Sequence, residues 1–360
     1  MKRFEAGTTI ISGHGAVSAL KELGGQRVFI VTDPFFFENG TAANIAALSG
    51  AAACGYFSEV KPDPTVELVA QGTAVLREFQ PDLLIALGGG SAMDCAKAMA
   101  YFSGTQAKFV AIPTTSGSGS EVTDFAVLTH DGVKYPLIDQ RLRPAVAILD
   151  SSLLENLPKG LIADTGFDVI SHALEALVAT NGGMITDALA REAFRTVYSL
   201  LTASFAGDKQ ARLPIHTAAT MAGMAFNQAG LGLCHGMAHS LGGVFHIPHG
   251  RLNAILLPAV IERNACAAGA KYAKLASEVG ITGGAQTIGV RNLKNALMRL
   301  RGQLNMPATL QQAGIDPLLV RKETPALVEA ILKDPCCDTN PVRVDAGMIR
   351  GILEEVTGRV

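Results

Sequence analysis

Short apolar runs that stop at turn residues restrict the fold of the first half of this sequence more than any other feature. Four such runs, between residues 27 and 150, are RVFIVTD, PDLLIALGGG, KFVAIPTT and PAVAILD. Runs that are apolar throughout are typical of strands buried on both faces, as in parallel sheets. Residues 65–79 and 91–102, which lie between them, have apolar side chains at helical spacing. The sequence therefore predicts a doubly wound α/β sheet.

The second half of the sequence has a different pattern. After residues 151–157, Ala, Leu and Met dominate, apolar residues recur with a period near 3.6, and strand-like runs become scarce. Asp150 ends the last predicted strand, and Pro158 is suited to the start of a helix. We therefore expect an α/β domain with a parallel sheet over residues 1–155 and an all-helical domain over residues 156–360.

Two glycine-rich turns follow two of the predicted strands. The run 83–87 leads into Gly88-Gly89-Gly90-Ser91 and then a helix, an arrangement in which backbone N–H groups can bind phosphate. A plain strand-to-helix turn with Ser91 as the N-cap explains this segment equally well. The second turn, TTSGSGSE at 114–121, would emerge on the same sheet edge, where its hydroxyls and amides suit phosphate and ribose. Its alternative is a flexible loop.

Asp33 ends the predicted strand 28–32 and bears on the choice of nucleotide. A carboxylate at this position can accept hydrogen bonds from both ribose hydroxyls and would repel a 2′-phosphate, which favours NAD over NADP. The alternative is a turn or helix-capping aspartate before Pro34.

Carboxylate and imidazole groups gather in two segments of the second half. Asp168 and His172 stand four apart in ADTGFDVISHALEAL, so a helix would place both on one face. The segment LGLCHGMAHSLGGVFHIPHG holds half of the eight histidines within fifteen residues. One carboxylate and three imidazoles suit Fe(II), Zn(II) or Mn(II) without selecting among them. The predicted metal ligands are Asp168, His172, His235 and His249.

Charge and hydropathy exclude several classes of partner. The formal charge of −2 gives no global attraction to nucleic acid or to an anionic membrane. We find neither a secretory signal nor the ~20 uninterrupted apolar residues of a membrane span. The six cysteines form no Cys-x-x-Cys pair, so reduced thiols and a cytoplasmic location are expected.

Four motifs in order, GGGSAMDCAK, TTSGSGSEVT, residues 168–175 and CHGMAHSLGGVFHIPHG, resemble the iron-containing (group III) alcohol dehydrogenase family over nearly the whole chain. The resemblance implies a Rossmann-like NAD-binding domain, an all-α metal-binding domain of the dehydroquinate synthase-like fold, and a site in the cleft between them. It implies that NAD and a metal ion, Fe(2+), Zn(2+) or Mn(2+), serve the interconversion of small primary alcohols or diols and their aldehydes by hydride transfer. An example of such a pair is 1-propanol and propanal. It also implies a homodimer, and for some relatives a bacterial microcompartment.

The resemblance also assigns residue roles. The four predicted ligands match the family's metal ligands, and His239 matches a histidine that relays the alcohol proton. The positions assigned to NAD binding are Asp33, Gly89, Gly90, Ser91, Asp94, Thr114, Thr115, Ser118, Asp124 and Lys134. Asp63 and Asp124 depart from the family, in which many relatives have Asn.

Three other functions remain open. A polyol dehydrogenase would differ mainly in metal and pocket polarity. A dehydroquinate synthase-like lyase would need a basic pocket, yet between residues 164 and 256 only Arg251 adjoins the histidines. A non-catalytic scaffold is the third. The residues that indicate an apolar pocket, with helix packing as the alternative, are Phe167, Met184, Met237 and Phe245. His246 is interpreted as a loop histidine, with a pocket position as the alternative.

Overall fold

Six parallel strands form the sheet in the first half of the computed structural model, which describes residues 4–130, 133–281 and 283–358. The strand order is β1-β8-β5-β4-β2-β3. The four central strands are the predicted ones, β2 (Arg27–Thr32), β4 (Leu83–Gly88), β5 (Lys108–Pro113) and β8 (Val146–Asp150). The edge strands β1 (Thr9–Gly13) and β3 (Ala53–Phe57) were not predicted, because partly exposed strands lack a continuous apolar run.

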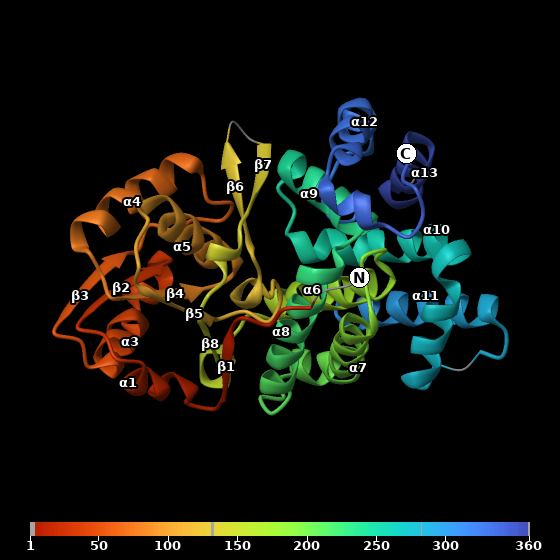
Figure 1. Cartoon of the computed structure of the whole chain (residues 1–360). Helices are drawn as coiled ribbons and strands as arrows, with labels where there is room; N and C mark the ends of the chain where they lie inside the picture. The colour runs from red at the N-terminus through yellow and green to blue at the C-terminus, as the bar shows by residue number, and fades with distance from the viewer. Residues whose placement is uncertain (1–3, 131–132, 282, 359–360) are drawn as a thin grey trace. The chain divides into compact units, whose positions relative to one another are not determined.

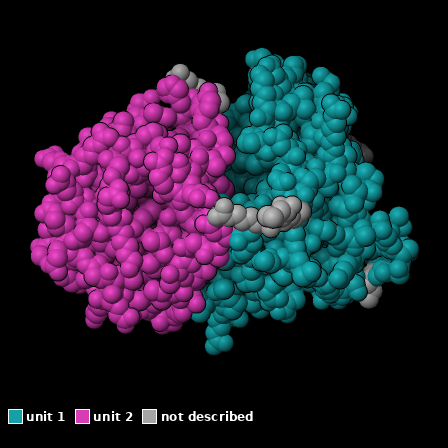
Figure 2. All heavy atoms as spheres, viewed as in Figure 1, with its two compact units in different colours: residues 1–4, 158–360 teal, residues 5–157 magenta. Residues whose placement is uncertain are grey.

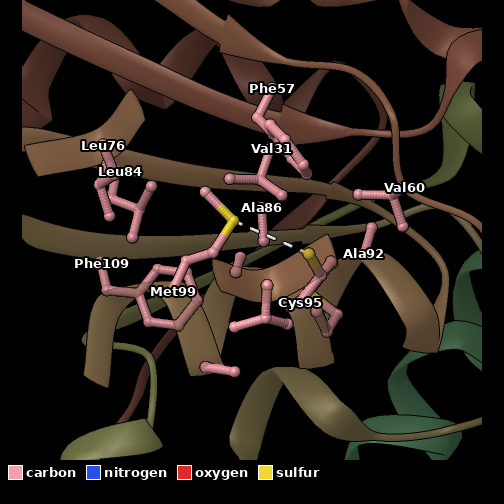
Figure 3. Packing of buried hydrophobic residues seen from close by; sticks show 14 of the residues in the cluster. Val31, Phe57, Val60, Leu76, Leu84, Ala86, Ala92, Cys95, Met99 and Phe109 are labelled. Atoms are coloured by element: carbon pink, nitrogen blue, oxygen red, sulfur yellow. Dashed lines mark hydrogen bonds between the residues drawn. The ribbon is translucent and has the colours of Figure 1, made fainter. Parts of the chain in front are cut away.

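Helices cover both faces of this sheet, which confirms the predicted α/β class (Figure 1). On β4, Leu84 and Ala86 pack against α4 and α5, whereas Leu83, Ile85 and Leu87 pack on the opposite side, with α1 and α3. Figure 3 shows the first of these layers. The alternation follows from the two-residue repeat of a strand. The helices of this half are α1 (Leu20–Leu23), α2 (Pro34–Glu38), α3 (Thr41–Ser49), α4 (Val66–Phe79) and α5 (Gly90–Ser103).

A hairpin separate from the main sheet was not predicted. Strands β6 (Phe125–His130) and β7 (Val133–Ile138) pair in antiparallel fashion. The fully buried Lys97 of α5 anchors its base, since its ammonium donates to Ser120 Oγ, Thr123 Oγ1, Thr123 O and Phe125 O at 2.8–3.0 Å. Burial lowers the pKa of Lys97 to about 8, although nearby carboxylates oppose the shift. Lys97 therefore ties the hairpin and the preceding loop to the sheet layer.

The second half of the chain is helical, as predicted. Its helices are α6 (Lys159–Val178), α7 (Met184–Ala206), α8 (Arg212–Ala229), α9 (Leu233–Phe245), α10 (His249–Glu278), α11 (Gln286–Gln303), α12 (Pro317–Leu332) and α13 (Ala346–Thr357). The chain divides into two compact units, distinguished by colour in Figure 2: the sheet unit, residues 5–157 (magenta), and the helical unit, residues 158–360 together with Phe4 (teal). Among the described residues, no helix is long and apolar enough to cross a membrane.

Lys97→Met tests the anchor of the hairpin. We expect it to destabilise the protein by about 2–4 kcal/mol, since four buried oxygen acceptors lose their donor. The exposed Lys108, at the start of β5, provides the matched control, because Lys108→Met removes a charge without breaking such a network. Chemical denaturation followed by circular dichroism measures both variants. Equal stability of the two would contradict the anchoring role.

Candidate functional site

One face of α6 supplies the first groups of a buried polar centre. Asp168 and His172 lie one helical turn apart, with Asp168 Oδ1 at 3.8 Å from His172 Nε2. Both side chains are buried. Four-residue spacing on a helix aims them in the same direction, as the sequence predicts.

Two further helices bring imidazoles to the same carboxylate. His235 near the start of α9 and His249 at the start of α10 each place Nε2 3.6 Å from Asp168 Oδ1. Ligand atoms of Asp168, His235 and His249 all lie within 4.8 Å of one another. The fourth predicted ligand, His172, is outside this mutual cluster but stacks on His235, with ring centroids 4.5 Å apart.

A close approach of α10 to α6 lets His249 reach this centre. A Cβ atom added to Gly250 would lie only 1.9 Å from the backbone oxygen of Asp164, so the two helices meet where a side chain would not fit. Arg251 reinforces the contact through two hydrogen bonds to the Asp164 carboxylate, at 2.9 and 3.2 Å. Glycine at position 250 is thus required by packing rather than by backbone angle.

The charges of the centre favour a cation. Burial alone would raise the pKa of Asp168, but the facing histidines hold it well below its usual range. Burial would lower the pKa of His235, yet the neighbouring Asp168 and Glu175 carboxylates raise it to about 9. An ionised carboxylate thus lies beside a protonated His235 imidazole, whereas burial lowers the pKa of His249 well below its usual value. A divalent ion can take the place of the proton on His235.

The spacing of the donors also fits a metal ion. Ligand atoms at the corners of a tetrahedron with bonds of about 2.1 Å are about 3.4 Å apart. The observed oxygen-to-nitrogen separations of 3.6–3.8 Å are close to that value. A carboxylate with imidazoles, and without thiolates, is a donor set suited to Fe(II), Zn(II) or Mn(II).

His239 lies one turn after His235 and has a different partner. Its Nδ1 is 2.9 Å from Asp334 Oδ2, and its ring stacks on His249 with centroids 5.2 Å apart. Burial opposes ionisation of Asp334, but the hydrogen bond and charge interaction with His239, together with hydrogen bonding at Cys336, outweigh it and lower the pKa of that carboxyl. If Nδ1–H donates to this carboxylate, Nε2 is left as a proton acceptor. The side chain is 27% exposed, so the ring is accessible.

Three residues of the centre were missed by sequence reasoning. Glu175 accepts a hydrogen bond from His235, Asn253 donates to Asp168, and Asp334 contacts His239. Glu175 could have been found, since it follows Asp168 by seven residues on the same helix face. Asp334 stands 95 residues after His239. No local spacing could have linked that pair.

The residues predicted to line an apolar pocket fall in different environments. Phe167 and Met237 are fully buried in the core, whereas Met184 is 88% exposed at the start of α7. Phe245 is partly buried at the end of α9. Exposed His246 follows it in the left-handed conformation and caps α9, which supports its interpretation as a loop histidine.

The predicted nucleotide residues at the sheet edge come together in the sheet unit. Thr114 N donates to Gly88 O, and a Cβ added to Gly88 would lie 3.5 Å from Asp33 Oδ2. Asp33 also caps α2 by accepting from Phe36 N, which confirms the helix-capping alternative, and its role in nucleotide binding stays a prediction. The ends of β2, β4 and β5 thus present one continuous polar edge.

The glycine turn at this edge leaves the start of α5 without a side-chain cap. Gly89, not Ser91, is the N-cap residue, so the alternative interpretation with Ser91 as the N-cap is wrong. Added Cβ atoms at Gly89 and Gly90 would lie 3.3 Å from side-chain atoms of Thr115 and Ser118, respectively. The two glycine-rich turns therefore lie side by side, and the start of α5 is suited to an anion.

The remaining predicted nucleotide residues have partners within the same unit. Asp94 accepts from Ser120 Oγ and Val127 N. Asp124 pairs with Arg143 through two contacts, at 2.5 and 2.6 Å. Lys134 pairs with Asp63 at 2.7 Å. These contacts shape the loop and the hairpin that follow β5.

A parallel sheet with a glycine turn at a helix start, together with a carboxylate–imidazole centre, is typical of metal-dependent dehydrogenases that use a dinucleotide. Family models match both halves of the chain: "Iron-containing alcohol dehydrogenase" over residues 7–151 and "Fe-containing alcohol dehydrogenase family, C-terminal" over residues 162–357. The chain belongs to the iron-containing alcohol dehydrogenase family and is an alcohol dehydrogenase.

Two relatives align over almost their full length. The 1-propanol dehydrogenase of Salmonella typhimurium is 42% identical over 371 residues, covering 99% of this chain and 100% of the relative. The NADPH-dependent butanol dehydrogenase of Clostridium saccharobutylicum is 37% identical over 385 residues, covering 98% and 97%.

Solved structures share the fold. A 1,3-propanediol oxidoreductase superposes with a TM-score of 0.93 at 32% identity, covering 99% of this chain and all of the other. The sulfoacetaldehyde reductase of Bifidobacterium kashiwanohense, solved in complex with NAD+, gives a TM-score of 0.89 at 26% identity and covers 99% and 98%. The predicted combination of a parallel α/β domain and a helical domain is thus confirmed.

Proposed function

We propose that the protein interconverts small primary alcohols or diols and their aldehydes, with NAD as the hydride carrier, and that propanal and 1-propanol are representative substrates. The observation that carries this proposal is the convergence of three imidazole nitrogens on Asp168 Oδ1 at 3.6–3.8 Å. The likeness to a 1-propanol dehydrogenase and to a 1,3-propanediol oxidoreductase supports the substrate class.

Asp168, His172, His235 and His249 hold the metal in this proposal, and Fe(2+) is its identity. When bound, the metal supplies Lewis acidity to the alcohol or carbonyl oxygen, and the nicotinamide accepts or supplies the hydride. The buried carboxylate sets the charge of the site, and the imidazoles supply neutral nitrogen donors. The metal-binding role falls to the helical unit.

His239 moves the alcohol proton in this proposal. Its Nδ1–H is held by Asp334 at 2.9 Å, which fixes the tautomer and leaves Nε2 to accept a proton from the substrate side. The ionised Asp334 then stabilises the protonated ring. Asp334 is thus the positioning partner of the relay histidine.

NAD binds to the sheet unit in this proposal. The pyrophosphate lies at the uncapped start of α5, between the glycine turn and the loop that follows β5. Asp33 accepts from the adenine ribose and disfavours a 2′-phosphate. The structure of a relative with NAD+ supports this choice, although another relative is NADPH-dependent. Asp33 is therefore the residue to test.

Rival functions fit the centre less well. A lyase acting on an anionic phosphate substrate needs free cations, yet Arg251, the basic residue beside the histidines, already pairs with Asp164. A scaffold would not need His239 oriented beside the metal ligands. A polyol dehydrogenase remains the second candidate, since the likeness to a 1,3-propanediol oxidoreductase favours diols.

We also propose a cytoplasmic homodimer. All six cysteines are free thiols, as expected in a reducing compartment. Among the described strands, β1 pairs only with β8, so its other edge can pair with a second copy. A location inside a bacterial microcompartment stays a prediction from the family resemblance.

Metal reconstitution tests the proposed reaction directly. The protein is purified anaerobically, stripped with chelator and given Fe(II), Zn(II) or Mn(II) separately. NADH oxidation is then followed with short aldehydes that include propanal. We expect one metal, Fe(II), to restore turnover of small aldehydes. Metal and NAD binding without turnover of any alcohol or aldehyde would contradict the dehydrogenase and favour the lyase or the scaffold.

His239→Gln tests the proton relay. We expect full metal content and a kcat lower by roughly 10²–10⁴-fold, the range of general acid–base catalysis. His246→Gln is the matched control, because this exposed histidine follows the same helix. Steady-state kinetics with metal analysis by mass spectrometry measures both variants. Loss of metal from His239→Gln would make His239 a ligand instead of a relay.

Asp33→Ser tests the choice of nucleotide. Serine keeps the ability to cap α2 but removes the charge. We expect kcat/KM for NADPH, relative to NADH, to increase by at least about tenfold, since repulsion of the 2′-phosphate is lost. Asp139→Ser, which changes another partly buried aspartate cap in the same unit, should leave the ratio unchanged. An unchanged ratio in Asp33→Ser would separate this residue from nucleotide selection.

A further inference from the structure

Glu175 is a buried carboxylate of α6 that contacts the start of another helix. Its side chain is only 2% exposed. It accepts three hydrogen bonds from α9: from Cys234 N at 2.7 Å, from His235 N at 3.3 Å and from His235 Nδ1 at 2.6 Å. The two backbone contacts satisfy N–H groups that a helix start leaves unpaired. The third contact goes to the ring of a proposed metal ligand.

The backbone around Glu175 leaves room for this carboxylate. Gly232 is the N-cap residue of α9 and has no side chain to cap it. A Cβ atom added there would lie 2.7 Å from Glu175 Oε1 and 2.8 Å from Asn340 Oδ1. Asn340 meanwhile accepts from Leu233 N at 3.2 Å. The first turn of α9 is therefore capped from outside its own sequence, and glycine makes space for the capping groups.

The other nitrogen of His235 faces a donor and the centre. Asn253 Nδ2 lies 3.3 Å from His235 Nε2 and donates to Asp168 Oδ1 at 2.8 Å. The amide N–H that faces Nε2 requires a lone pair on that nitrogen, and the carboxylate that faces Nδ1 requires a proton there. Both contacts therefore favour the tautomer with the proton on Nδ1. That tautomer leaves the Nε2 lone pair available as a metal ligand.

We propose that Glu175 is a positioning residue that fixes the tautomer and ring orientation of His235 and so presents its Nε2 to the metal. The inference rests on the proposed ligand set. A carboxylate that accepts the second N–H of a ligating imidazole orients the ring and increases its basicity. Because the same carboxylate caps α9, it fixes the helix and the ring together, and it links α9 to the helix that carries Asp168 and His172.

The alternative is that Glu175 serves only as a helix cap. Capping requires just the two backbone contacts, and it predicts a change in folding stability alone. Positioning of His235 predicts a change in metal affinity as well. The two roles therefore separate when metal affinity is measured independently of stability and of activity.

Glu175→Gln makes this separation. The amide oxygen can still accept from one backbone N–H, but the amide cannot accept from every donor that faces the two carboxylate oxygens. The probe is Co(II), added to the chelator-stripped full chain under anaerobic conditions. Its visible absorption reports the ligand environment, and competition with a chelator of known affinity gives Kd. We expect Co(II) to bind about 10–100-fold more weakly than to the parent, with a shifted spectrum.

Asp345→Asn is the matched control. Asp345 caps α13 by accepting from Met348 N at 2.8 Å. Asp345→Asn removes a capping carboxylate whose described contacts include none of the proposed metal ligands. We expect the parent Co(II) affinity in this variant. His235→Ala, which removes a ligand, should bind at least as weakly as Glu175→Gln.

The outcomes distinguish this inference from the function on which it rests. If His235→Ala binds Co(II) as tightly as the parent, the proposed metal site itself fails. If His235→Ala weakens binding but folded Glu175→Gln does not, only the positioning role is overturned. If Glu175→Gln does not fold, Gly232→Ala decides, since the added methyl crowds Oε1. Parent-like Co(II) affinity in folded Gly232→Ala would overturn the inference, and a 10–100-fold loss would support it.

Discussion

The arrangement of the helical half of the chain depends on the contacts of the buried Asp168 carboxylate. A single oxygen, Oδ1, lies within 3.8 Å of three imidazole nitrogens and accepts from Asn253. Burying a charge costs several kcal/mol unless neighbouring groups compensate for it. The compensation comes from α9 and α10 as well as from α6 itself, so the ionised state of one side chain ties three helices to a single arrangement.

That arrangement also requires helices that approach unusually closely. At Gly250 the backbone of α10 meets the backbone of α6, and at Gly232 the start of α9 receives the Glu175 carboxylate. A methyl group at either position would collide with the neighbouring helix or its side chain. Small residues thus act here as ligand-positioning residues, because the reach of an imidazole from its own backbone is fixed. The residues of this centre are therefore constrained both by the chemistry of the ligand groups and by the packing of the helices.

The sequence predicted the four central strands, the helical half and the groups that converge on Asp168, because each depends on local spacing. It could not predict β3, which is half exposed, or the β6–β7 hairpin, whose base is set by Lys97. Asp334 and Asn253 were missed because their partners are far away in the chain. The alternative with Ser91 as the N-cap was wrong, because the N-cap residue is Gly89, two positions earlier, and α5 begins at Gly90.

The proposed metal site and the proposed NAD site compensate charge by different means. In the helical unit an ionised carboxylate and imidazoles set the charge directly. In the sheet unit, Lys134 and Arg143 are already neutralised by Asp63 and Asp124, so the start of α5 offers backbone dipoles instead. Dipoles oriented by a buried network need no rearrangement to accept an anion. Lys97 holds the loop that follows β5 beside the start of α5. The conformational entropy of ordering that loop is therefore lost during folding rather than during cofactor binding.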